Sequence, residues 1–283
     1  MSSTTYEIRW DSFNVGGDDT SSSTTYQLRD TIGDLAVDGA TSTTYDMRPG
    51  YREGIYDRTA TFEIFIKNRA SQVAATSYAG STVGVSSTAG ISVGGVVLLV
   101  ENEGFGQNSA IGRVTSIGAL SIDIDFETNS GTTPSINGTG DYLYRMDGTS
   151  MAFGALSTAG ITTSSIGWEV NADVDEGYSV YIYEDHNLTL GGLVSGNAIS
   201  DVSDGTVSIG STEYGARSSD KTLASSTFDT NDSAITSSLL QVGSRADNSF
   251  QSRDFLTFKA SRSSSAAGGT YSHTVYLIYV GDY

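Results

Sequence analysis

The sequence predicts an all-β protein, with a C-terminal β-sandwich of jelly-roll or immunoglobulin-like type, a smaller β-barrel-like domain and an extended N-terminal strand arm. Three observations predict this class. Apolar and polar residues alternate with a period of two in many short segments. Gly, Ser and Thr fill the stretches between these segments. Aromatic residues are mostly Tyr and Phe, with 16 and 10 copies, and both favour half-buried pleated surfaces.

Short strands of similar sequence are expected first. The consensus S-T-T-Y-x-[ILM]-R begins at Ser3, Ser23 and Ser42. Three short copies are too few for a solenoid, so the pattern indicates strands separated by turns that contain Gly and Asp. Residues 1–22 are therefore interpreted as an N-terminal arm, and residues 23–58 as short strands that join the sandwich.

The N-terminal arm has the pattern of a donor strand. Its apolar side chains alternate with Glu7, Arg9 and Asp11, and such a strand satisfies its backbone only by pairing along a sheet edge. We expect it to complete the sheet of a neighbouring identical subunit; pairing within its own subunit is the alternative. The residues expected to contact the neighbour are Tyr6, Ile8, Trp10, Phe13 and Val15.

The rest of the chain divides into two predicted domains. Residues 59–128 are predicted to form the small β domain, because short alternating segments follow one another between Gly-rich turns. Residues 129–140 are rich in Gly, Ser and Thr and are predicted to be a linker. Residues 141–283 are predicted to form the sandwich. The final strand, residues 274–280, is apolar on both faces and is expected to be central in its sheet.

Alternation in the C-terminal strands also predicts the core of the sandwich. The residues expected to be buried there are Trp168, Val170, Ile182, Val207, Phe258, Val275 and Leu277. A short helix fits only in residues 218–240, where Ser, Thr and Asp argue against one.

Charge and hydropathy exclude two classes of partner. The net charge is −18, which repels phosphate backbones and anionic membranes, so no nucleic-acid partner is expected. The longest purely apolar run is Val96–Val100, too short to span a bilayer, so no membrane insertion is expected. The start of the chain has no signal-peptide pattern; if the protein is secreted, its signal peptide has been removed or replaced by Met1.

The sequence predicts that the protein is not an enzyme. It has no Cys, hence no disulfide and no thiol nucleophile. Its two histidines, His186 and His273, lack partners at metal-ligand spacing and are expected in surface loops. A serine hydrolase elbow of the form G-x-S-x-G is also absent. A hydrolase is the weakest of the functional classes considered.

No cofactor is expected, although two acidic loops leave calcium open. Both loops supply oxygen ligands, but neither has the spacing of an EF-hand. The candidate calcium ligands are Asp201, Asp204, Asp229 and Asp232.

Several segments resemble secreted β-sandwich surface and filament proteins of small-genome, uncultivated bacteria, a group that includes pilus-like donor-strand subunits. The segments that carry the resemblance are residues 26–33, 45–52, 177–181, 213–217 and 267–275. They are spread over most of the length of the chain and include no catalytic residue. The resemblance implies an extracellular or cell-surface location.

The predicted function is that of a structural subunit of an extracellular filament, assembled from identical subunits by donor-strand exchange. The alternative is a carbohydrate-binding or adhesive cell-surface module that contacts a glycan or a cell surface. Trp10 is the Trp available for a glycan platform, because Trp168 alternates with core positions. Lys67 and Asn68 also resemble the Lys–Asn pairs of adhesins that form isopeptide bonds.

Overall fold

The structure of the chain is a computed structural model. It describes residues 40–41, 46–47, 60–104, 108–172, 176–194, 196–247 and 249–282. The expected N-terminal arm, with Tyr6, Ile8, Trp10, Phe13 and Val15, lies outside the described residues. The chain divides into two compact units, Met1–Thr59 and Ala60–Tyr283. In the first unit, β1 (Ala40–Thr41) and β2 (Asp46–Met47) form an antiparallel pair.

The second unit confirms the all-β prediction. Among the described residues, the helical content is a single 3₁₀ turn, η1 (Arg69–Ser71). All remaining elements are strands, arranged in three sheets of seven, seven and three strands. The segment 218–240 contains no helix, in agreement with its content of Ser, Thr and Asp.

One seven-stranded sheet is curled into a barrel-like shape. Its strands are β4 (Val73–Ala79), β5 (Thr82–Val85), β6 (Val96–Val100), β7 (Ser109–Ile117), β8 (Ser121–Ile124), β9 (Thr128–Asn129) and β10 (Tyr142–Arg145). The pairing order is β6-β10-β4-β5-β8-β7-β9, and a further pairing of β6 with β7 closes the ring. Closure leaves the ring strands without a free edge. The interior is apolar and includes Val83, Leu99, Val114, Ile122 and Leu143.

The other two sheets form the sandwich. The larger has the order β18-β13-β14-β15-β17-β11-β3 and the smaller β16-β12-β19. The larger sheet consists of β3 (Ala60–Ile66), β11 (Thr162–Ala172), β13 (Leu188–Leu190), β14 (Ala198–Asp201), β15 (Glu213–Ser218), β17 (Ser249–Ser261) and β18 (Tyr271–Ser272). The smaller consists of β12 (Tyr178–Glu184), β16 (Leu240–Arg245) and β19 (Val275–Gly281).

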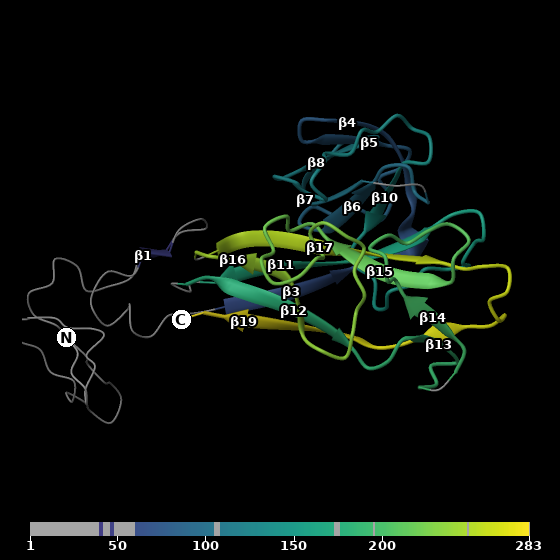
Figure 1. Cartoon of the computed structure of the whole chain (residues 1–283). Helices are drawn as coiled ribbons and strands as arrows, with labels where there is room; N and C mark the ends of the chain where they lie inside the picture. Colours follow the sequence, from purple (N-terminus) through teal and green to yellow (C-terminus); the bar gives the residue numbers. More distant parts are fainter. Residues whose placement is uncertain are drawn as a thin grey trace, which may run out of the picture. The chain divides into compact units, whose positions relative to one another are not determined.

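The larger sheet lies between the smaller sheet and the barrel-like sheet. Figure 1 shows the barrel strands on one side of β11 and β17, with β12 and β19 on the other. Trp168 and Val170 of β11 belong to the sandwich core. Gly167, between Ile166 and Trp168, faces the other way: a Cβ there would lie 3.5 Å from side-chain carbons of Ile111 and Met146. Because both faces of β11 are covered, nearly all of its residues are buried.

Strand pairing groups the residues differently from the expected boundaries. β3 falls within the range expected for the small domain, yet it pairs with β11 of the sandwich. β10 falls within the range expected for the sandwich, yet it pairs with β4 and β6. Both strands therefore connect the two parts of the second unit, and the barrel-like sheet extends past the predicted linker.

The predicted core is confirmed for Trp168, Val170, Ile182 and Phe258, which are 0% exposed and belong to the sandwich core. Val207 is also buried, at 1% exposed, but it is not part of that cluster. The two core residues predicted in β19 are only half-buried. The prediction of a central final strand is wrong, because β19 is an edge strand that pairs with β12 alone among the described strands. One apolar face of β19 packs against the core. The other face is also apolar, but its residues are exposed to solvent.

Candidate functional site

Two edge strands, β3 and β19, lie on the same side of the sandwich, which we call the open flank. The rings of Phe62 in β3 and Tyr279 in β19 stack with centroids 5.6 Å apart and planes at 25°. This contact crosses from one sheet to the other. Each strand is the last in its sheet among the described residues. The end of β3 has one further backbone contact, in which the Gly148 amide donates to the Ile66 carbonyl at 2.8 Å.

The apolar side chains at the open flank are incompletely buried. In β3, Ile64 pairs with Trp168 of the core, so both side chains project from the same face of the sheet. Trp168 is 0% exposed, whereas Ile64 is 47% exposed. In β19, Val275 and Leu277 project toward the core but are only half-buried. The open flank therefore exposes part of the hydrophobic core surface.

The outer face of the three-stranded sheet is also apolar. Cross-strand partners Tyr183 and Tyr276 stack with centroids 4.6 Å apart and planes at 8°. On the same face of β19, Ile278 and Val280 are 37% and 42% exposed. Large hydrophobic residues in an exposed edge strand are characteristic of surfaces that pair with another chain.

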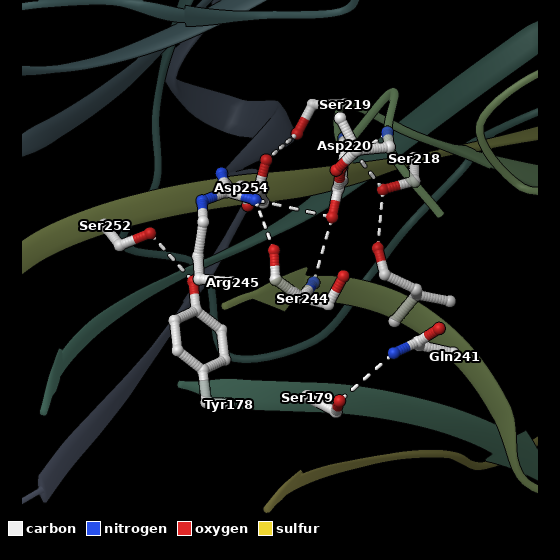
Figure 2. Close-up of polar contacts among 12 residues, drawn as sticks. Tyr178, Ser179, Ser218, Ser219, Asp220, Gln241, Ser244, Arg245, Ser252 and Asp254 are labelled. Carbon is white, nitrogen blue, oxygen red and sulfur yellow. Dashed lines mark hydrogen bonds and ion pairs between the residues drawn. The ribbon is translucent and has the colours of Figure 1, made fainter. Parts of the chain in front are cut away.

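The opposite edge of this sheet, at β16, is covered instead. Ser218 and Ser226 donate side-chain hydrogen bonds to the carbonyls of Val242 and Gln241, both 2.6 Å long. The Ser244 amide donates to the carboxylate of Asp220 at 2.9 Å. Figure 2 shows how Ser218 at the end of β15 and Asp220 in the loop that follows reach the backbone of β16. The two edges of the sheet therefore differ: side chains hydrogen-bond the backbone at one, and no described strand pairs at the other.

Arg245 and two buried carboxylates form the most enclosed polar cluster at the β16 edge (Figure 2). The Arg245 guanidinium contacts Asp254 at 2.6 Å and Asp220 at 3.4 Å. Burial raises the pKa of Asp254 to about 6, with a contribution from the negative charge of Asp220, while Arg245 opposes the shift. Ser219 donates a further bond to Asp254 at 2.8 Å. With its carboxylates bonded in this way, the cluster ties β16 to β17.

A second ion network joins the barrel-like sheet to the sandwich. Arg253 of β17 is 2% exposed and donates to Glu169 at 2.5 Å and to both oxygens of Asp125 at 2.8 and 2.6 Å. Arg113 of the barrel lies 3.0 Å from Glu169. The pKa of Glu169 lies below its ordinary value because the hydrogen bonds and charges of the two arginines outweigh burial. The network fixes the two parts of the unit together.

Lys67 does not approach the side chain of Asn68. The Lys67 amine lies 2.7 Å from Glu103 and 3.8 Å from the centroid of the Tyr144 ring. Burial lowers the pKa of Lys67, and Glu103 opposes that shift. The Asn68 amide donates instead to Asp147 at 2.8 Å. The expected resemblance to an isopeptide pair is therefore not supported by the placement of these two side chains.

The candidate calcium ligands have other partners. Asp232 is buried, accepts from the Val207 amide at 2.9 Å and pairs with Lys259 at 2.7 Å. Asp204 accepts from the amide of Thr206 at 3.0 Å, and Asp229 from the hydroxyl of Thr230 at 3.4 Å. Within the described ranges, no group of three or more His, Cys, Asp or Glu side chains is arranged to hold a metal ion. Calcium binding at these loops stays a prediction.

The fourth candidate, Asp201, belongs to a buried cluster that the sequence did not predict. The cluster comprises Glu184, Asp201, Tyr214 and His273, and the prediction of a surface loop is wrong for His273, whose side chain is 4% exposed. Its Nδ1 lies 2.9 Å from Glu184, and its ring meets that of Tyr214 edge-on at 5.1 Å. Burial and the charge of Glu184 raise the pKa of Asp201 to about 6, while His273 opposes the shift.

Comparison with protein-family models, with curated proteins and with solved structures finds no match for this chain. Among the described residues, no helix has the length and apolar character required to cross a bilayer.

Proposed function

We propose that the protein is a structural subunit of an extracellular filament in which an extended strand of one subunit completes the open flank of the next. The observation that carries this proposal is the open flank itself. Two sheet edges end side by side there, and core-facing Ile64 is 47% exposed. An added strand would pair along a free edge and cover this apolar surface at the same time.

The segment proposed to dock there is the N-terminal strand with Tyr6, Ile8 and Trp10 on one face. Its alternation matches the need for one apolar row toward the core and one polar row toward solvent. Insertion of this segment into a second copy is a heterologous contact that does not close on itself, so it generates a fibre from identical subunits. The proposal assigns no catalytic role and places the protein at the cell surface.

Negative-stain electron microscopy of the purified protein tests this proposal directly. We expect fibres from the full chain and folded monomers from a variant that lacks residues 2–15. A synthetic peptide of residues 2–15, added in excess to the full chain, is expected to cap the flank and shorten the fibres. Normal fibres from the deletion variant would contradict donor-strand exchange.

A second candidate function is an adhesive or carbohydrate-binding module. The stacked Tyr183 and Tyr276 on the outer face of the small sheet favour it, because planar aromatic pairs provide a surface on which sugar rings stack. Glycan-array binding that is lost in Tyr276→Ala, together with the absence of fibres, would support this function over the filament.

A further inference from the structure

A large cavity lies at the end of the sandwich where β3 ends and β19 begins, and Ile66 and Val275 of these strands line it. Its volume is about 950 Å³, and it lies between the loop that precedes β11 and the loop that precedes β19. Its wall includes the buried core residues Ile166, Leu188 and Ile199. Half-buried apolar side chains from the two loops complete the wall: Met151, Phe153, Leu156, Tyr271 and Val275. Native cores contain few voids larger than a water molecule, whereas this volume is typical of a ligand-binding site.

The charges in the cavity wall have one sign. Among the described residues, no Asp or Glu contributes to the wall, although the chain carries a net charge of −18. The titratable side chains that line it are Arg262, His273 and Tyr271. An anion entering this cavity therefore meets a cationic group and no carboxylate in the wall itself.

The side chain of Arg262 is held in position by the backbone. Its Nε donates to the carbonyl of Leu156 at 2.8 Å, which fixes the side chain against the loop before β11. No carboxylate of the described residues forms an ion pair with Arg262, whereas Arg113, Arg145, Arg245 and Arg253 all have one. Its two terminal nitrogens have the geometry that binds a carboxylate in a bidentate manner.

We propose that this cavity binds a small amphiphile with an aliphatic body and a carboxylate head, the carboxylate being held by Arg262. The apolar wall accounts for the body. The Arg262 guanidinium, which has neither an ion-pair partner nor an acidic neighbour in the wall among the described residues, accounts for the head. This inference does not depend on filament formation, because the cavity lies within one chain.

Hexanoate, octanoate and decanoate serve as probes in isothermal titration calorimetry with the full chain, below the concentrations at which they form micelles. We expect one site per chain and an affinity that rises by about threefold to fourfold with each added methylene, as expected for burial of a CH₂ group. Absence of binding by decanoate would overturn the proposal.

Variants separate the roles of head and body. Arg262→Gln is expected to weaken octanoate binding by about tenfold or more, in line with the loss of a hydrogen bond between charged groups, and to change binding of uncharged 1-octanol less than about twofold. Arg145→Gln, which removes an arginine outside the cavity, is the matched control and should leave both unchanged. Ala266→Trp, which fills the cavity from its loop, should abolish binding of both probes. Equal octanoate affinity in wild type and Arg262→Gln, or in wild type and Ala266→Trp, would contradict the proposal, provided that thermal denaturation shows each variant to be folded.

Discussion

Phe62 of β3 and Tyr279 of β19 stack across the two layers of the sandwich, with ring centroids 5.6 Å apart. The two residues are far apart in the sequence and belong to different sheets. Their contact marks the flank where both sheets end. At the opposite edge of the smaller sheet, side chains hydrogen-bond the backbone of β16. The first two predictions test whether the open flank, and not another surface, is where subunits join.

A lysine placed in the open flank is expected to block assembly. Ile64→Lys puts a charge where the added strand would lay its apolar row, and the burial of that charge is costly. Because Ile64 is already 47% exposed, the subunit itself should still fold. We expect folded monomers and no fibres by electron microscopy and size-exclusion chromatography.

Ile278→Lys is the matched control for Ile64→Lys. Ile278 has a similar exposure of 37% but lies on the outer face of β19. If strands add at the open flank, this variant should still form fibres. Loss of fibres in Ile278→Lys with normal fibres in Ile64→Lys would place the contact on the outer face instead.

Removal of Phe258 is expected to destabilise the sandwich strongly. The side chain is 0% exposed and stacks on Tyr214 with centroids 6.2 Å apart. Phe258→Ala should lower the free energy of unfolding by about 3–5 kcal/mol, because it removes buried surface and leaves a cavity. Phe250→Ala in the same strand removes a side chain that is 67% exposed and should change it by about 0.5 kcal/mol or less. Urea denaturation measures both, and equal effects would contradict the assigned core.

Arg253 is expected to contribute more to stability than an exposed arginine. Arg253→Met leaves Glu169 and Asp125 without their buried partner, which typically costs about 3–5 kcal/mol. Arg145→Met removes a half-exposed pair with Asp147, and about 1 kcal/mol or less is expected. A loss for Arg253→Met as small as that for Arg145→Met would mean that the network does not hold the two sheets together.

The pH dependence of stability should reveal the raised pKa of Asp201. Its pKa is raised from an ordinary 3.8 to about 6 in the folded protein. Between these values the unfolded chain has released the proton that the folded protein retains, so the contribution of Asp201 to the stability of the wild type falls as pH rises through this window. Asp201→Asn removes the carboxyl group that titrates in this window. Its stability relative to wild type should therefore increase from about pH 4 to about pH 6 and then level off. A difference independent of pH, measured by urea denaturation across this range, would contradict the raised pKa.

Local patterns in the sequence were sufficient to predict the fold class. The alternation around Trp168, Val170 and Ile182 identifies buried strand faces, and all three residues are 0% exposed. The distinction between an edge and a central strand was not predictable in β19. Period-two patterns report which faces are apolar, whereas the position of a strand in a sheet depends on partners that are distant in sequence.

The same limit applies to the candidate site. Arg253 and Asp125 are separated by 128 residues, and nothing in either segment indicates the other. The cluster of Glu184, Asp201 and His273 likewise forms only when β12, β14 and the start of β19 meet. The sequence predicted a surface loop for His273 because no partner lies at metal-ligand spacing, whereas its partner Glu184 is distant in the sequence.

The pairing of β3 with β11 has a consequence for the synthesis of the chain. β3 leaves the ribosome before every strand of the barrel-like sheet, but its partner β11 follows all of them. Non-local pairings of this kind form late in folding. During that interval both edges of β3 lack a partner from the described sheets. β3 can then pair with another newly made chain, and such mispairing becomes more frequent as the concentration of these chains rises. Folding yield should therefore depend on expression level, even for variants whose final stability is unchanged.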